Sequence, residues 1–224
     1  MNLVFEHFDL YLKAFGWTLW LFLASAVASL VVGTIIAALR VGPVGTMRWA
    51  AAIYVAIVRN TPLVLWFILI AQGLPMLGIT FRSVEKLHID SYYFRACLAL
   101  TLYTSTFVAE AIRSGINAVP LGQAESARAI GLTFGGTMRH VILPQAFRAS
   151  VPPLASVLIA LLKNTSVAYV FGVYEATTRM KYFQNIAAQD LGIFILFALG
   201  YVVLVELVSA GAYALERRWK AARA

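Results

Sequence analysis

Residues 14–39 read AFGWTLWLFLASAVASLVVGTIIAAL and contain no charged side chain. A helix that crosses a bilayer needs about 20 mostly apolar residues, so this run is long enough to span a membrane. The segment ahead of it carries acidic residues and lacks a basic region followed by a small-residue cleavage site, which indicates a retained helix rather than a removable signal peptide. The run therefore predicts a first membrane span close to the N-terminus.

The whole chain, like this run, is rich in apolar residues and poor in charged ones. Of its 224 residues, 61% are hydrophobic and 12% are charged, roughly half the charged fraction of an ordinary soluble domain. The net charge of +8 is a weak argument for nucleic-acid binding, because basic residues of a membrane protein must first be placed relative to the bilayer. Cys97 is the single cysteine, which excludes an intrachain disulfide and a thiolate metal cluster. We expect an all-α, polytopic membrane protein that forms one domain over residues 1–224.

Five runs have enough apolar residues to cross the membrane, although the last three each contain an ionisable residue. The predicted spans are residues 14–39, 60–81, 92–112, 151–173 and 191–215. The second span follows another apolar stretch at residues 49–58 and is interrupted by Arg59-Asn60-Thr61-Pro62. Because Pro62 removes one backbone donor and disturbs the preceding turn, we expect the second span to be long, broken or tilted.

The Lys and Arg residues between the spans predict the orientation, because cytoplasmic loops carry an excess of positive charge. One side of the membrane receives Arg40, Arg48, Arg113, Arg128, Arg139, Arg148, Arg217, Arg218, Lys220 and Arg223. The other side receives the smaller set Lys13, Arg82, Lys86, Arg95, Arg179 and Lys181. The N-terminus is therefore expected outside, and the C-terminus and the long loop at about residues 113–150 in the cytoplasm.

Within that loop, residues 122–144 read GQAESARAIGLTFGGTMRHVILP. The helix-favouring stretch from Gln123 stops at Gly131, and a second short helix is expected from Thr133 until Pro144 ends it. One alternative is an amphipathic helix in the lipid interface, with arginines facing acidic headgroups. Glu125 and the small side chains beside it favour close docking into a groove on another protein instead.

A membrane-embedded enzyme and an autonomous channel or carrier are rival function classes. The three histidines, His7, His88 and His140, are scattered and form no catalytic or metal cluster in the sequence. The chain also lacks a phosphate-cradling Gly-Lys-Thr/Ser loop, so ATP hydrolysis would require another chain. No internal repeat of the kind found in many carriers is present. We expect no catalytic residue, no metal site and no cofactor.

Five segments in this order resemble the permease subunits of bacterial ABC importers for polar amino acids. They are the RNTP at residues 59–62, the AEAIRSGI at residues 109–116, the loop at residues 122–144, the PQA at residues 144–146 and the KNTS at residues 163–166. The stretch from residue 102 to Gly131 is similar to the glutamate-import permeases of actinobacteria. Ser126, Val141 and Asn164 depart from the usual Ala, Ile and Asp, and the last departure removes a partner for Lys163.

The resemblance implies a type I importer permease of the bacterial plasma membrane, with glutamate preferred and glutamine, arginine or histidine as alternatives. It implies a cytoplasmic ATPase dimer, a second identical or related permease subunit and an extracytoplasmic amino-acid-binding protein as partners. It also implies that the cytoplasmic loop couples the permease to the ATPase. The residues it assigns to coupling are Gly122, Gln123, Glu125, Ser126, Ala127, Gly131 and Pro144.

Two cations near the middle of the bilayer are candidates for the substrate path, because an unpaired ammonium there costs at least about 2.5–3.5 kcal/mol on insertion scales. Lys163 is expected either to attract the carboxylate of an amino acid or to form a structural ion pair with Glu110 or Glu206. Arg59 lies beside the helix break, a position where transporters bind substrates. The alternative role for Arg59 is to brace a gate or to extend its charged end to the membrane interface. The candidate substrate-binding set is Arg59, Asn60, Thr61, Tyr103, Lys163 and Thr165.

Overall fold

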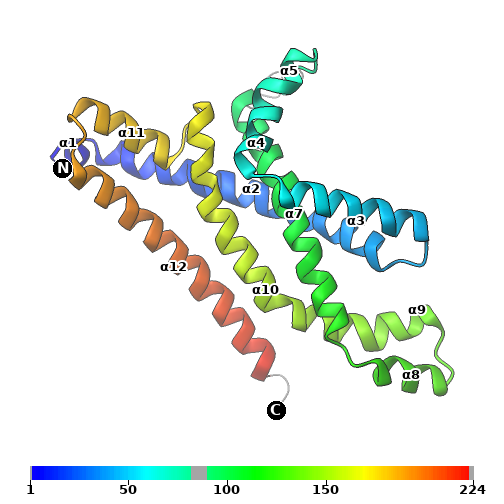
Figure 1. Cartoon of the computed structure of the whole chain (residues 1–224). Coiled ribbons are helices and arrows are strands. Elements are labelled where there is room, and N and C mark those ends of the chain that lie inside the picture. The colour runs from blue at the N-terminus through cyan, green and yellow to red at the C-terminus, as the bar shows by residue number, and fades with distance from the viewer. Residues whose placement is uncertain (1, 82–89, 222–224) are drawn as a thin grey trace.

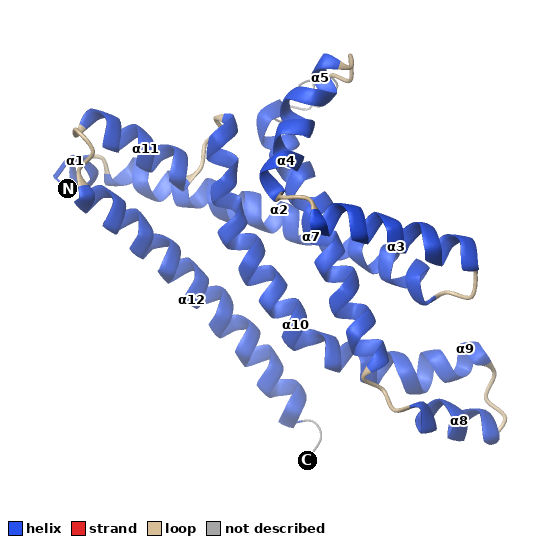
Figure 2. Cartoon of the chain, viewed as in Figure 1, coloured by secondary structure: helices blue, strands red, loops and turns tan. Residues whose placement is uncertain are grey.

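A computed structural model describes residues 2–81 and 90–221, and these residues form helices joined by short turns (Figures 1 and 2). Arg82, Lys86, His88 and Arg223, which entered the arguments above, lie outside the described residues. The described residues form no strand, which confirms the predicted all-α class. The elements are α1 (Asn2–Glu6), α2 (Phe8–Val41), α3 (Gly45–Asn60), α4 (Leu63–Ile68), η1 (Leu69–Gly73), α5 (Leu74–Met76), α7 (Ser91–Asn117), α8 (Leu121–Ala129), α9 (Phe134–Thr137), η2 (Met138–Ile142), α10 (Leu143–Asn164), η3 (Thr165–Phe171), α11 (Ala176–Ile186) and α12 (Leu191–Ala221).

Three helical segments of the described chain are long and apolar enough to cross a membrane: Phe8–Val41, Phe134–Phe171 and Leu191–Ala214. The pair Gly45–Asn60 and Leu63–Met76 adds a fourth if its two helices form one broken span. The 27-residue helix α7, which was predicted as the third span, contains Arg95, Glu110 and Arg113 and is not among these segments. Five spans and their orientation therefore remain predictions.

The helix break predicted at Pro62 is present. Helix α3 ends at Asn60, α4 begins at Leu63, and the two axes differ by 103°. Side chains satisfy carbonyls at the end of α3, because the Thr61 hydroxyl donates to Ile57 O at 2.8 Å and the Trp66 indole donates to Val58 O at 3.2 Å. The bond from Trp66 crosses the bend and joins α4 to the end of α3.

Helix α2 packs closely on α7 through small residues that recur every fourth position. Ser25, Ser29, Gly33 and Ala37 are all buried, and residues spaced by four lie on one helix face. A Cβ atom built on Gly33 would lie 2.5 Å from the Cβ of Val108 on α7, so glycine is needed at this crossing. Small residues at such contacts allow helix backbones to approach closely in membranes.

Helix α11 is tied to α2 and α12 through its first turn. The carboxylate of Glu175 is fully buried and accepts hydrogen bonds from the backbone N–H groups of Thr177 and Thr178 at 2.8 and 2.7 Å. The Tyr201 hydroxyl of α12 also donates to this carboxylate at 2.8 Å. The backbone N–H of Ala176, the residue before Thr177, donates to the Thr18 hydroxyl of α2 at 2.9 Å. These bonds fix the short helix α11 on the bundle.

The prediction that Pro144 ends a short helix is wrong. Residues from Phe134 to Phe171 form one continuous helical segment, and Pro144 lies in the first turn of α10. The π-helical turn η2 directly precedes it, and the wider spacing of such a turn accommodates a proline that cannot donate a backbone hydrogen bond. The loop therefore continues into α10 without a second break.

Candidate functional site

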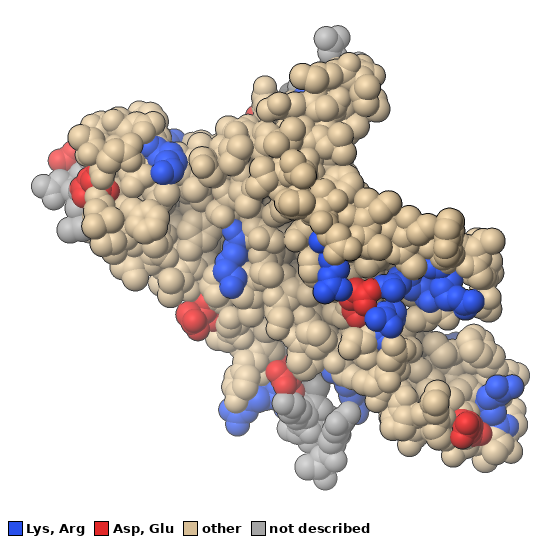
Figure 3. Space-filling view, in the orientation of Figure 1, with Lys and Arg blue, Asp and Glu red and all other residues tan. Residues whose placement is uncertain are grey.

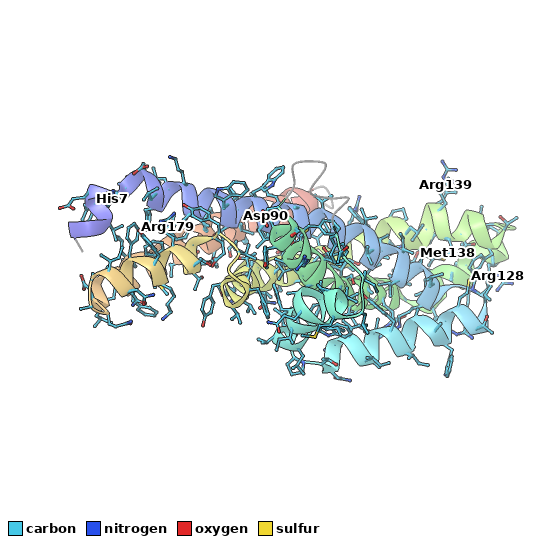
Figure 4. The ribbon with its side chains drawn as sticks, turned by 90° about the horizontal axis from the view of Figure 1, so that it is seen from above. His7, Asp90, Arg128, Met138, Arg139 and Arg179 are labelled. Atoms are coloured by element: carbon cyan, nitrogen blue, oxygen red, sulfur yellow. The ribbon has the colours of Figure 1, made fainter. Side chains whose placement is uncertain are left out.

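Residues 121–142, which we call the hairpin, project from the bundle beyond the ends of α7 and α10 (Figure 1). Three large apolar side chains on it are strongly exposed: Leu121 at 82%, Ile130 at 80% and Phe134 at 67%. In the view from above, Arg128, Met138 and Arg139 of the hairpin lie at one end of the molecule, and His7 and Arg179 lie toward the other (Figure 4). Exposed apolar groups on a segment that projects from the bundle indicate a surface that contacts a partner.

The turn of the hairpin is built by Gly131. Its φ of 89° lies in the left-handed region that favours glycine. Its N–H donates to Arg128 O at 3.0 Å, and the N–H of Leu132 donates to Ala127 O at 3.1 Å, the pair of bonds that defines a Schellman helix end. Thr133 then caps α9 by accepting from the N–H of Gly136 at 3.2 Å. The helix stop at Gly131 and the start near Thr133 were both predicted from the sequence.

The predicted coupling residues occupy four different settings in the structure. On α8, the exposed members of this set are Gly122, Gln123, Glu125 and Ser126. Ala127 is buried within the chain. Gly131 forms the turn, whereas Pro144 lies apart from the hairpin, at the start of α10.

The base of the hairpin is connected firmly to both long helices that enter and leave it. A Cβ atom on Gly115 of α7 would lie 2.6 Å from Ala146 O of α10, so the two helices touch there. The Gln145 side chain donates to Val141 O at 2.9 Å across the π-helical turn. The base of the hairpin is therefore joined to α7 and α10 by packed contacts.

An ion cluster lies on α2 and α7. The Glu110 carboxylate pairs with Arg113 at 2.9 Å, as the sequence predicted, and also with Arg40 at the end of α2. In the space-filling view, charged groups on this face gather beside α3 and on the hairpin, while most of the surface is uncharged (Figure 3). The structural ion pair between Lys163 and Glu110 or Glu206 is not formed among the described residues.

Two members of the predicted substrate-binding set contact the same aromatic ring, that of Phe107, which was not among the predicted residues. The Arg59 guanidinium lies 5.4 Å from the centroid of the Phe107 ring, and the Tyr103 ring lies 5.0 Å from the same ring. A cation over a ring face within about 6 Å is attracted by it. The spacing of Tyr103 and Phe107, one helical turn apart on α7, was a signal available in the sequence.

The other members of that set differ in how available they are. The Thr61 and Thr165 hydroxyls donate to backbone carbonyls of their own helices at 2.8 and 2.7 Å, and Thr165 is fully buried. Asn60 and Lys163 are exposed, and Lys163 forms no ion pair with any residue that the structure describes. Arg59, Asn60 and Lys163 are therefore the exposed members of the set, and Tyr103 is partly exposed.

Comparisons with known proteins cover nearly the whole chain. Residues 29–221 match the family described as binding-protein-dependent transport system inner membrane component. The chain is 44% identical over 211 residues to the glutamate transport system permease protein GluC of Corynebacterium glutamicum, with 92% of each chain covered. It is 34% identical over 218 residues to the probable glutamine ABC transporter permease protein GlnM of Bacillus subtilis, with 97% of each covered. The crystal structure of an amino acid ABC transporter with histidines superimposes with a TM-score of 0.87 at 28% identity, with 96% of each chain covered.

Proposed function

The chain belongs to the family of binding-protein-dependent transport system inner membrane components, and from this membership we propose that it forms the translocation path for glutamate in an ATP-driven importer. It is a permease subunit of an amino-acid ABC importer of the inner membrane, and ATP is hydrolysed by a separate subunit. Glutamate is proposed because the relative that is 44% identical is a glutamate permease. Glutamine is the second candidate, since a relative that is 34% identical is a probable glutamine permease.

The hairpin is proposed as the docking surface for the ATPase, and its exposed apolar side chains are the observation that carries this assignment. Leu121, Ile130 and Phe134 are exposed beside the polar groups of Glu125 and Arg128. A surface with an apolar centre and a charged rim is typical of protein–protein contacts. In this proposal, closure of the ATPase dimer moves the hairpin, and the contacts at its base carry the movement into α7 and α10.

The substrate path is proposed to use Arg59 and Lys163. Both are exposed cations on segments next to or within the candidate spans, and neither forms an ion pair among the described residues. An acidic amino acid carries two carboxylates and one ammonium group, so each of the two cations can pair with one carboxylate. Asn60 and Tyr103 supply neutral hydrogen-bonding groups beside Arg59, next to the helix break where transporters commonly bind solutes.

The proposed assembly has two permease subunits, two ATPase subunits on the cytoplasmic side and a binding protein on the outer side. The orientation in this proposal follows the basic residues, with the N-terminus outside and the hairpin in the cytoplasm. The ATPase and binding-protein partners follow from the family, whereas a second copy or a related permease chain as the partner subunit is part of the proposal.

Uptake into proteoliposomes tests the substrate assignment. The full chain is reconstituted with its ATPase and binding protein, and ATP-dependent uptake of labelled glutamate is measured with unlabelled glutamine, arginine or histidine as competitors. Uptake that unlabelled glutamate suppresses most strongly supports the proposal. Stronger suppression by another amino acid reassigns the substrate and leaves the importer function in place.

A further inference from the structure

Phe107 on α7 contacts the guanidinium group of Arg59 at the end of α3. Helix α7 packs against both α3 and α4, and the three helices meet where the chain bends (Figure 1). The Arg59 Cζ lies 5.4 Å from the centroid of the Phe107 ring, within the distance at which a ring face attracts a cation. The ring is therefore a direct partner of a residue in the proposed substrate path.

The position of the Phe107 ring is fixed by α7. Its centroid lies 5.0 Å from that of the Tyr103 ring, one helical turn earlier, with 54° between the two ring planes. The residues on either side, Thr106 and Val108, are buried, and Phe107 itself is half-buried. The contact with Arg59 is thus made by a ring on a well-packed helix and not by a side chain on a loop.

The backbone beside Arg59 is also held in place. Val58 O accepts hydrogen bonds from the Thr61 N–H at 3.4 Å and from the Trp66 indole at 3.2 Å. The Thr61 hydroxyl donates to Ile57 O at 2.8 Å. These bonds fix the end of α3 relative to α4, so the long side chain of Arg59 is the part that remains to be positioned.

The kind of partner matters for what Arg59 can bind. Arg40 and Arg113 both pair with the Glu110 carboxylate, which neutralises their charge. Arg59 has no ion pair and no side-chain hydrogen bond among the residues that the structure describes. A phenyl ring carries no net charge and has no oxygen or nitrogen acceptor. The ring of Phe107 therefore holds the Arg59 guanidinium without neutralising it.

We propose that Phe107 is a positioning residue that holds Arg59 in the orientation that binds a substrate carboxylate. This inference rests on the proposed function, in which Arg59 belongs to the substrate path. A guanidinium presents its donors in a planar fork that matches a carboxylate, and fixing a binding group in its bound orientation lowers the entropy lost on binding. Glutamate and glutamine both carry an α-carboxylate, so either amino acid can report on the contribution of Phe107.

Equilibrium binding to the purified permease–ATPase complex, without the binding protein, tests this role. The Kd values of labelled glutamate and labelled glutamine are measured, and the variants are compared with the amino acid that wild type binds more tightly. Phe107→Leu keeps an apolar side chain but removes the ring, and we expect it to raise the Kd by about two- to fivefold. Phe107→Tyr keeps the ring and should restore the wild-type Kd. Phe194→Leu, at an exposed phenylalanine on α12, is the matched control and should change nothing.

The double variant separates positioning from a general structural role. Arg59→Gln is expected to raise the Kd by about tenfold or more, and adding Phe107→Leu to it should cause no further loss, because the ring no longer has a cation to hold. A full additional loss in the double variant would overturn the inference. A raised Kd in Arg59→Gln with an unchanged Kd in Phe107→Leu would also overturn it while leaving Arg59 in the substrate path. Unchanged Kd values in both single variants would remove Arg59 from that path and overturn both proposals.

Discussion

Arg40 at the end of α2 forms an ion pair with Glu110 on α7, and this contact joins the first long helix to the helix that leads into the hairpin. The same carboxylate also pairs with Arg113. Glu110 therefore lies between two guanidinium groups from different helices and neutralises their mutual repulsion. All three side chains are at least partly shielded from solvent.

Replacing Glu110 by glutamine is expected to destabilise the chain. The change leaves two neighbouring guanidinium groups without their shared anion, and we expect the free energy of unfolding in detergent to fall by about 2 kcal/mol. Arg113→Gln is the matched control, because Arg113 is the most exposed of the three and such a pair contributes less than about 1 kcal/mol. Equal losses in the two variants would contradict the bridging role of Glu110.

The close contact between α2 and α7 makes Gly33 sensitive to substitution. Gly33→Ala places a Cβ atom 2.5 Å from Val108 and 2.8 Å from Ser105 O, so we expect a loss of about 1–3 kcal/mol in stability. Gly16→Ala, on the same helix with no atom within 4 Å of its Cβ, is expected to be neutral or to stabilise by up to about 1 kcal/mol. Thermal unfolding of the two variants, measured side by side, distinguishes the contact from helix propensity.

Local signals in the sequence predicted the local features of this fold. Pro62 predicted the break between α3 and α4, because proline restricts the backbone. Gly131 predicted the helix stop in the hairpin, because glycine readily adopts the positive φ that ends a helix. Glu110 and Arg113 were predicted to pair, since residues three apart share a helix face. Each of these features depends only on neighbours in the chain.

Features that depend on contacts between residues far apart in the sequence could not be predicted from local sequence patterns. The pairing of Arg40 with Glu110 needs the packing of α2 against α7, and Arg40 alone looks like an ordinary basic residue at the end of a span. Thr165 looked available for a substrate until the structure showed its hydroxyl bonded within its own helix. Pro144 was misread because the π-helical turn that accommodates it leaves no distinct pattern in the sequence.

The buried carboxylate of Glu175 predicts a pH dependence of stability. Burial raises the pKa of Glu175 above its ordinary value, and the hydrogen bonds from Thr177, Tyr201 and Thr178 offset part of this rise. The folded state therefore holds this proton more tightly than the unfolded state, so stability falls as the pH rises from the ordinary glutamate pKa through the raised one.

Glu175→Gln is expected to remove this contribution, because glutamine keeps an acceptor oxygen for the cap but does not titrate. Melting temperatures of wild type and variant are measured across the acidic to neutral range. The wild-type curve should decline with rising pH relative to the variant. Parallel curves over the whole range would show that Glu175 does not contribute to the pH dependence.

Lys163 is expected to affect transport without affecting folding. Because it forms no ion pair with the described residues, Lys163→Ala should leave the unfolding temperature unchanged. A charge-assisted hydrogen bond to a substrate carboxylate contributes about 1.5–3 kcal/mol, so the KM for glutamate uptake should rise about tenfold or more. Lys181→Ala, at an exposed position on α11, is the control. An unchanged KM in Lys163→Ala would remove Lys163 from the substrate path.

The amount of glutamate imported per ATP hydrolysed tests the central claim, that the hairpin couples this permease to its ATPase. The measurement compares wild type with Gly131→Asp in proteoliposomes that contain the ATPase and the binding protein. Gly131→Asp places a side chain at a φ of 89°, which disfavours the turn by about 1 kcal/mol or more, and Gly135→Ala serves as the hairpin control. We predict that Gly131→Asp inserts and assembles normally but imports far less glutamate per ATP. An import ratio equal to that of wild type would contradict the claim.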